Sequence, residues 1–255
     1  MDLSIVIPAY EESEKIVHDV REAAEFLAGN HLTGQIIVVD DGSTDDTAAV
    51  AKNALSDPHE GVSLEVIRYP EHKGKGYAVR TGIASATGDF VMFADSGSCV
   101  PYEEVLHGLK MIKDDECDIA HASRRVDGCR VDYSQAFHRR ICSNLFRSCI
   151  LWLMGIPSDL TDTQCGFKIY RGTIARRLYR EAVTDGSAFD IEIILRARRA
   201  GYRIKEFPVR WTCDPDSRLS VVKSVWYIPR ELWQMKMALR HEHRNRSDTA
   251  PATYR

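Results

Sequence analysis

Three signals that would assign a protein class at once are missing from this sequence. No uninterrupted apolar run approaches the roughly 18 residues of a membrane-spanning helix. The seven cysteines include no C-x-x-C pair, and their dispersal favours reduced thiols in a cytosolic compartment over a disulfide framework. The net charge is only −3, which argues against a general nucleic-acid binder. We therefore expect a protein that is soluble or lies on a membrane surface, with no nucleic-acid partner.

The common nucleotide-binding fingerprints are incomplete as well. There is no Walker A sequence, and residues 71–78 (EHKGKGYA) carry only two of the three glycines of G-x-G-x-x-G. A helix is predicted over 77–86, so this loop either places Lys75 near a phosphate or is an ordinary turn with two solvated lysines. A Rossmann-type dehydrogenase is disfavoured, because the partial fingerprint does not follow the first strand.

What the chain does contain is an alternation of strands and helices. Short apolar runs at 3–7, 36–39, 62–68 and 90–94 predict strands, and the first leaves no room for a signal peptide before the fold. Apolar residues at helical spacing between 16 and 27 predict a helix, and a second is expected over 47–55. With 44% hydrophobic residues in 255, the chain can bury a sizeable core. The pattern predicts an α/β fold with a parallel sheet.

Polar groups follow three of these predicted strands. Tyr10 and Glu12 come after the first, Asp40 and Asp41 after the second, and Asp95 after the fourth. The carboxyl ends of parallel strands border the crevice in which open α/β sheets bind ligands. The carboxylates could instead only cap helices, and residues 43–46 (STDD) do resemble a capping box. Three strand ends together favour a nucleotide site.

Seven segments in register resemble the family-two glycosyltransferases, and within them the branch that loads glucose or mannose onto dolichyl or polyprenyl phosphate. The likeness covers about residues 3–220. The segments are VIPAYEE, VVDDGSTDDT, KGKGYAVRTG, the Asp95 strand end, DTQCGFKIY, FDIEII and EFPVRW. The resemblance implies an α/β nucleotide-sugar fold of the GT-A type, with a mostly parallel central sheet flanked by helices and amphipathic helices at the C-terminus.

The resemblance also implies a nucleotide pocket. Asp41 would accept a hydrogen bond from the N–H of uracil or guanine, since a carboxylate is an acceptor only. UDP-glucose is the favoured donor and GDP-mannose the second, because the region after Asp95 and the DTQCGFKIY segment are similar to the glucosyl branch. The residues that the resemblance assigns to nucleotide binding are Pro8, Ala9, Tyr10, Glu12, Asp40, Asp41, Lys75 and Arg124.

The metal motif departs from the family pattern. Family members hold Mg²⁺ or Mn²⁺ with Asp-x-Asp, because hard cations prefer oxygen ligands. Here the first aspartate is Asp95 and the second position is Gly97. Three interpretations stay open: a weakly held metal on Asp95, cations such as Arg124 and Arg218 in place of the metal, or nucleotide binding without turnover.

Catalytic and acceptor residues follow from the remaining motifs. Asp190 in FDIEII matches the family's base and, with Asp95, is assigned to catalysis, although it could instead cap a helix over 191–199. An acceptor that is a phosphate is already an anion and needs mainly positioning. By resemblance, the acceptor and its phosphate are contacted by Asp162, Gln164, Arg139 and Arg218.

Two segments have the composition of a membrane interface. Residues 141–154 (ICSNLFRSCILWLM) are too short to span a bilayer and would lie in the interface or in the core. Residues 221–240 mix aromatic and basic side chains, as lipid head groups favour. We expect a catalytic domain over 1–220, with a nucleotide half (1–100) and an acceptor half (101–220). An amphipathic helical segment (221–240) and a disordered tail (241–255) would follow.

The function expected from the sequence is an inverting transfer of a hexose, glucose favoured, from a nucleotide sugar to a polyprenyl-phosphate lipid. The enzyme would lie on the cytoplasmic face of a membrane. Two alternatives stay open: transfer to a soluble or glycan hydroxyl, and nucleotide-sugar binding without turnover because of Gly97.

Overall fold

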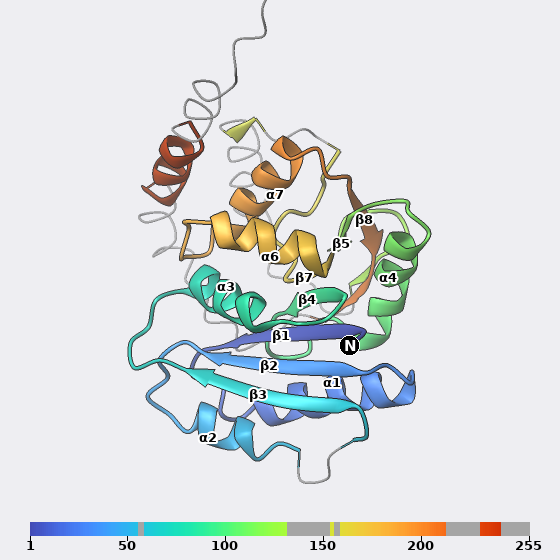
Figure 1. The fold of residues 1–255 in the computed structure, drawn as a ribbon, viewed down its shortest axis with the longest axis vertical. Coiled ribbons are helices and arrows are strands. Elements are labelled where there is room, and N and C mark those ends of the chain that lie inside the picture. The colour runs from blue at the N-terminus through green and yellow to red at the C-terminus, as the bar shows by residue number, and fades with distance from the viewer. Residues whose placement is uncertain (56–58, 132–153, 156–158, 213–229, 241–255) are drawn as a thin grey trace, which may run out of the picture.

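The structure is a computed structural model that describes residues 1–55, 59–131, 154–155, 159–212 and 230–240 (Figure 1). Its N-terminal half alternates strands and helices. They are β1 (Leu3–Ala9), α1 (Ile16–Gly29), β2 (Gly34–Asp40), α2 (Thr47–Lys52), β3 (Val62–Arg68), α3 (Lys75–Ser85) and β4 (Phe90–Ala94). β3, β2, β1 and β4 lie side by side in that order, and all their pairings are parallel.

The second half completes the same sheet. It comprises η1 (Tyr102–Glu104), α4 (Val105–Lys113), β5 (Ile119–Ser123), β6 (Arg130–Val131), β7 (Phe167–Arg171), α6 (Gly172–Glu181), α7 (Phe189–Arg199), β8 (Ile204–Pro208) and β9 (Arg210–Trp211). β7 runs antiparallel between β4 and β5, and β8 pairs in parallel with β5. The seven strands follow the order β3-β2-β1-β4-β7-β5-β8, and β6 and β9 form a separate pair.

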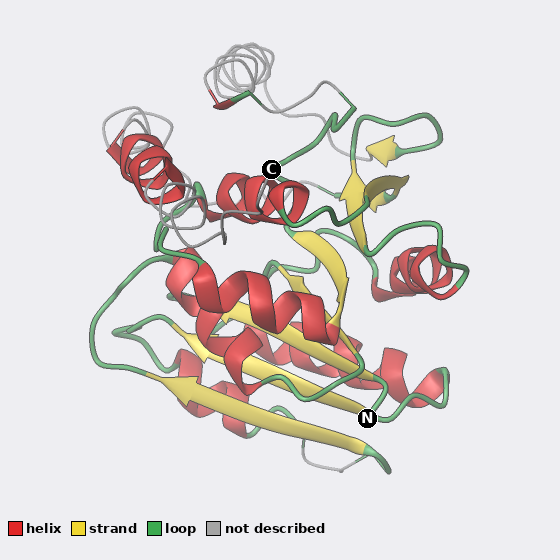
Figure 2. Cartoon of the chain, turned by 45° about the horizontal axis from the view of Figure 1, so that its top comes forward, coloured by secondary structure: helices red, strands yellow, loops and turns green. Residues whose placement is uncertain are grey.

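Helices cover both faces of the sheet (Figure 2). α1, α2 and α4 pack on one face against side chains such as Ile5, Ile36 and Ile169. α3, α6 and α7 pack on the other face against side chains such as Val6 and Val39. The central strands β1 and β2 are therefore buried on both faces, which explains their nearly unbroken apolar sequence.

A helix over 230–240 lies against α7 and buries Leu232, Met235 and Leu239 there. The outward side chains Trp233 and Met237 are 65% and 48% exposed. In the parts of the chain that the structure describes, no helix has the length and hydropathy needed to cross a membrane.

The predicted α/β sheet is confirmed, and some boundaries move. Pro8 and Ala9 belong to β1, and α2 ends at Lys52 instead of residue 55. The predicted capping box is wrong: the Ser43 hydroxyl accepts the Glu11 N–H, and the N-cap Asp46 makes no side-chain capping bond. The predicted tail over 241–255 and all of residues 141–153 lie outside the described residues.

Candidate active site

The carboxyl ends of β1, β2 and β4 meet at one edge of the sheet. Ala9, the last residue of β1, lies opposite Asp40, the last residue of β2, and the Asp41 N–H donates to the Ala9 carbonyl at 2.8 Å. β4 is the other neighbour of β1 and ends at Ala94, one residue before Asp95. The three polar strand ends noted in the sequence are thus brought to the same edge, as the parallel arrangement requires.

Asp41 organises the loop that precedes α3. Its two carboxylate oxygens accept the N–H groups of Lys73 at 2.7 Å and Gly74 at 2.9 Å, and His72 Nδ1 lies 2.9 Å from Oδ2. Gly42, in the loop after β2, has φ +73°, and a Cβ there would lie 2.5 Å from the Glu71 carbonyl carbon. The backbone of this loop therefore touches the backbone of the loop before α3. Asp41 is 2% exposed and is engaged by the loop before α3, so its predicted bond to a base stays a prediction.

The other predicted nucleotide residues divide into buried and open groups. Pro8 and Ala9 are buried within β1, and Asp40 is fully buried, where it accepts the Ser43 N–H at 3.0 Å. Tyr10 is 39% exposed, with its ring centroid 4.3 Å from that of His72. Glu12 donates its N–H to the Thr47 hydroxyl at 2.9 Å. Of this group, Tyr10 offers the open aromatic surface that a base can stack on, and the nucleotide role of the group stays a prediction.

Lys75 and Asp95 form the first of three ion pairs at the site. Lys75 Nζ lies 2.6 Å from Asp95 Oδ1, and the two side chains are 34% and 35% exposed. Burial opposes the charge of Lys75, but Asp95 and Asp190 outweigh it, so the pKa of this lysine is raised. Gly166 allows the arrangement, because a Cβ there would lie 2.0 Å from Asp95 Cγ.

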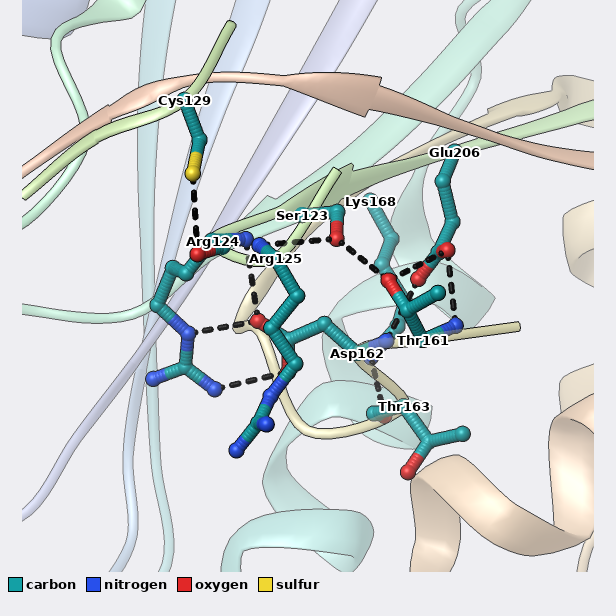
Figure 3. A network of polar contacts seen from close by, with 9 residues as sticks. All are labelled: Ser123, Arg124, Arg125, Cys129, Thr161, Asp162, Thr163, Lys168 and Glu206. Carbon is teal, nitrogen blue, oxygen red and sulfur yellow. Dashed lines mark hydrogen bonds and ion pairs between the residues drawn. The ribbon is translucent and has the colours of Figure 1, made fainter. Parts of the chain in front are cut away.

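Arg124 and Asp162 form the second pair (Figure 3). Arg124 follows β5 directly and donates two hydrogen bonds to the Asp162 carboxylate, from Nε at 2.6 Å and from Nη2 at 2.8 Å. Its guanidinium also lies 5.3 Å from the Trp211 ring centroid. A carboxylate oxygen of Glu206, in β8, accepts the Asp162 N–H at 2.6 Å. Burial opposes ionisation of Asp162, but the bonds and charge of Arg124 outweigh it and lower the pKa of this carboxyl.

Lys168 and Asp190 form the third and most buried pair. Lys168 Nζ lies 2.5 Å from Asp190 Oδ1 and donates to the Thr163 carbonyl at 3.2 Å, and the paired side chains are only 1% and 5% exposed. Burial raises the pKa of Asp190, and Lys168 and Lys75 offset part of that rise. Asp190 does not cap α7, since Ala188 is the N-cap residue.

Lys168 was missed in the sequence, although a charge inside the otherwise apolar FKIY segment was an available signal. The neighbouring Glu192 accepts the N–H groups of Val183 and Thr184 and pairs with Arg196 at 2.7 Å, so it holds the loop before α7. Each of the three carboxylates thus faces its own cation. Asp95 and Asp190 both raise the pKa of Lys75, so the Lys75–Asp95 pair and the Lys168–Asp190 pair interact electrostatically.

The remaining assigned residues are less informative. Gln164 is exposed in the turn before β7, two residues after Asp162. Cys165 is 2% exposed and acts as a small buried apolar residue, and burial raises the pKa of its thiol to about 12. Arg139 and Arg218 lie outside the described residues, so their predicted contacts with the lipid phosphate stay predictions.

The side chains at the Asp-x-Asp position do not form a set of ligands that would hold a divalent cation. Asp95 is the one carboxylate of the motif, and its oxygen already carries the Lys75 ammonium. At the second motif position, the Gly97 N–H donates to both carboxylate oxygens of Asp19, at 2.9 and 3.1 Å. Within the described ranges, no three histidine, cysteine, aspartate or glutamate side chains group as metal ligands.

The sheet order and the acidic strand ends define a GT-A type glycosyltransferase fold. A family model, "Glycosyl transferase family 2", matches residues 4–184, and the chain belongs to that family. It is 33% identical over 245 residues to a dolichyl-phosphate β-glucosyltransferase of Drosophila melanogaster, which covers 92% of this chain and 74% of that protein. The enzyme of the same name from Saccharomyces cerevisiae is 28% identical over 254 residues, with 92% and 74% covered.

Solved structures give the same fold. Glucosyl-3-phosphoglycerate synthase of Mycobacterium tuberculosis, solved with Mn²⁺, UDP and phosphoglyceric acid, superposes with a TM-score of 0.65 at 18% identity. The match covers 93% of this chain and 77% of the synthase. The same synthase was also solved with Mg²⁺ and UDP, so GT-A relatives do bind divalent cations. At this identity the likeness carries the fold alone.

Proposed function

We propose that this enzyme transfers glucose from UDP-glucose to the phosphate of a dolichyl or polyprenyl lipid, with inversion at the sugar carbon. The observation that carries the proposal is the pair of partly exposed cations at the strand ends, Lys75 and Arg124, because a donor diphosphate and an acceptor phosphate both need cations nearby. The relatives named dolichyl-phosphate β-glucosyltransferases support the choice of glucose and of the lipid.

The reaction needs one bond made and one broken. An oxygen of the lipid phosphate attacks C1 of glucose, and the bond from C1 to the UDP oxygen breaks, so UDP leaves with the electron pair. Because the attacking phosphate is already an anion, no proton has to be removed from it. Lys75, which contacts Asp95, would stabilise negative charge on the departing diphosphate.

The position of Asp190 favours a phosphate acceptor over a hydroxyl. A general base must come within hydrogen-bond reach of the proton that it removes. Asp190 is 5% exposed as a side chain, and one of its oxygens is occupied by Lys168. Asp190 is therefore better suited to holding Lys168, which donates to the Thr163 carbonyl in the adjacent turn, than to deprotonating a soluble alcohol.

We also propose that the helix over 230–240 rests on the cytoplasmic membrane surface. Its outward face carries Trp233 and Met237, and Arg230 and Arg240 are exposed at its ends. Aromatic and basic side chains together suit the head-group region of a membrane. This contact would bring the enzyme to a substrate whose hydrocarbon tail stays in the bilayer.

A second candidate function is nucleotide-sugar binding without turnover. It is favoured by one observation: Gly97 stands where the family has its second metal-binding aspartate. Transfer to a measurable product from any acceptor would exclude it.

The direct test uses labelled UDP-glucose and GDP-mannose with dolichyl phosphate or dolichol in detergent. The proposal expects label in the lipid only with UDP-glucose and dolichyl phosphate. Label in dolichol would point to a hydroxyl acceptor, and label from GDP-mannose would reassign the donor. Bound UDP-glucose with no product from any acceptor would leave the binding function as the better account.

A further inference from the structure

We propose that Lys75 supplies the charge that a divalent cation supplies in Asp-x-Asp relatives, so that UDP binds this enzyme without metal. This inference rests on the proposed function, since it assigns a role in the same donor site. It follows from three features of the described residues: the contact of Lys75 with Asp95, the way the backbone holds Lys75, and the structure of the turn at Gly97.

The Lys75 ammonium lies against one of the two Asp95 oxygens that a metal could bind. It is 2.6 Å from Asp95 Oδ1, and its charge also acts on Asp190. A divalent cation at the same oxygen would meet an ammonium at close range and would have to displace it. At Asp95 Oδ1, the lysine and the metal are therefore competitors.

The backbone holds Lys75 in place from both sides. The Gly74 N–H donates to Asp41 at 2.9 Å, and the Tyr77 N–H donates to the Asp185 carbonyl at 3.0 Å. Gly76 packs closely as well, since a Cβ there would lie 2.5 Å from the Thr184 carbonyl oxygen. The Lys75 backbone is therefore fixed, and the contact with Asp95 positions the ammonium at the end of the side chain.

The turn after Asp95 is built into the fold instead of being open to a metal. Gly97 has φ +90°, and its N–H donates to both oxygens of Asp19 in α1. The Ser98 hydroxyl also donates to Asp19, at 2.8 Å. Asp19 is 1% exposed, so a buried carboxylate of α1 uses the polar groups at the position where relatives place a metal ligand.

The test measures UDP affinity by calorimetry in EDTA and in Mn²⁺. For the wild-type enzyme we expect the two dissociation constants to agree within about threefold. Lys75→Met should weaken UDP binding in EDTA by about tenfold to a hundredfold, the worth of a charge-assisted bond. Lys75→Arg should recover part of that loss. Lys110→Met removes the same charge from the distant α4 and serves as the matched control.

A second variant tests the proposal from the opposite direction. Gly97→Asp restores the second carboxylate. The free Mn²⁺ signal in electron paramagnetic resonance, compared with that of the same Mn²⁺ and UDP without protein, should then fall with the variant and stay unchanged with wild type. Gly97→Ala controls for the strain of a side chain at φ +90°.

The outcomes separate this inference from the proposed function. Wild-type UDP binding that requires Mn²⁺, or a Lys75→Met variant with unchanged affinity in EDTA, would overturn the inference and leave the glucosyltransferase intact. Metal-independent, Lys75-dependent UDP binding without any glucose transfer would support the inference and refute the proposed function. Failure of UDP to bind under every condition would overturn both.

Discussion

The buried pair of Lys168 and Asp190 gives a sharp prediction about stability. Lys168→Met keeps much of the side-chain volume and removes the cation, which leaves the Asp190 carboxylate buried without its direct partner and with only the more distant charge of Lys75. Breaking a buried ion pair from one side costs about 3–5 kcal/mol in the free energy of unfolding. In a domain of this size, each kcal/mol lowers Tm by about 2–4 °C.

The pH dependence of this loss has a definite sign. Burial raises the pKa of Asp190, and Lys168 is among the groups that lower it, so removing Lys168 raises the pKa further. A carboxyl whose folded-state pKa exceeds the unfolded value stabilises the fold at low pH, and this stability is lost as pH rises through the folded-state pKa. The deficit of Lys168→Met relative to wild type should therefore be larger at about pH 8 than at about pH 5.

Urea unfolding followed by circular dichroism at the two pH values measures the deficit. The double variant Lys168→Met/Asp190→Leu removes both charges and should recover most of the lost stability, since an apolar replacement of a buried pair is often neutral. A single variant as stable as wild type at both pH values would refute the reasoning. So would a double variant less stable than the single one.

Three further variants probe the site and the membrane helix. Gly166→Ala places a methyl group against Asp95, so we expect a loss of about 1–3 kcal/mol in unfolding free energy and a fall in kcat/KM, and wild-type kinetics would contradict this. Arg124→Lys replaces a forked contact with a point charge and should lower kcat/KM by about tenfold, checked in steady-state assays. Trp233→Ser should weaken flotation with anionic vesicles, whereas Leu106→Ser, an exposed apolar control on α4, should not; equal binding of both would disprove the membrane contact.

The parallel half of the fold was predictable because its signals are local. β3 and β4 coincide with the predicted strands, since an alternating run such as VSLEVIR, a short apolar run such as FVMFA and the turns that end them are all signals within a few residues. β7 was harder: the DTQCGFKIY motif was recognised by resemblance, but its antiparallel place between β4 and β5 depends on pairing between distant segments. No period in the sequence encodes that insertion.

The sequence predicted which residues form the candidate site better than it predicted which of them contact one another. Asp95, Arg124, Asp162 and Asp190 were all named from motifs, and their roles stay predictions. The sequence did not show which cation faces which carboxylate, because those contacts join separate elements. The Gly97 bond to Asp19 spans 78 positions. The departure at Gly97 was visible, but its structural counterpart in α1 was not.

The most direct test of the proposed function is the nature of the glucose linkage formed on the lipid. UDP-glucose should be incubated with the enzyme and dolichyl phosphate in detergent, and the purified lipid product examined by NMR. Inverting transfer predicts glucose joined to the lipid phosphate as the β-anomer, with UDP released in equal amount. An α-linkage would contradict inversion. UDP release without lipid-linked glucose, or glucose on a hydroxyl, would contradict the phosphate-acceptor account.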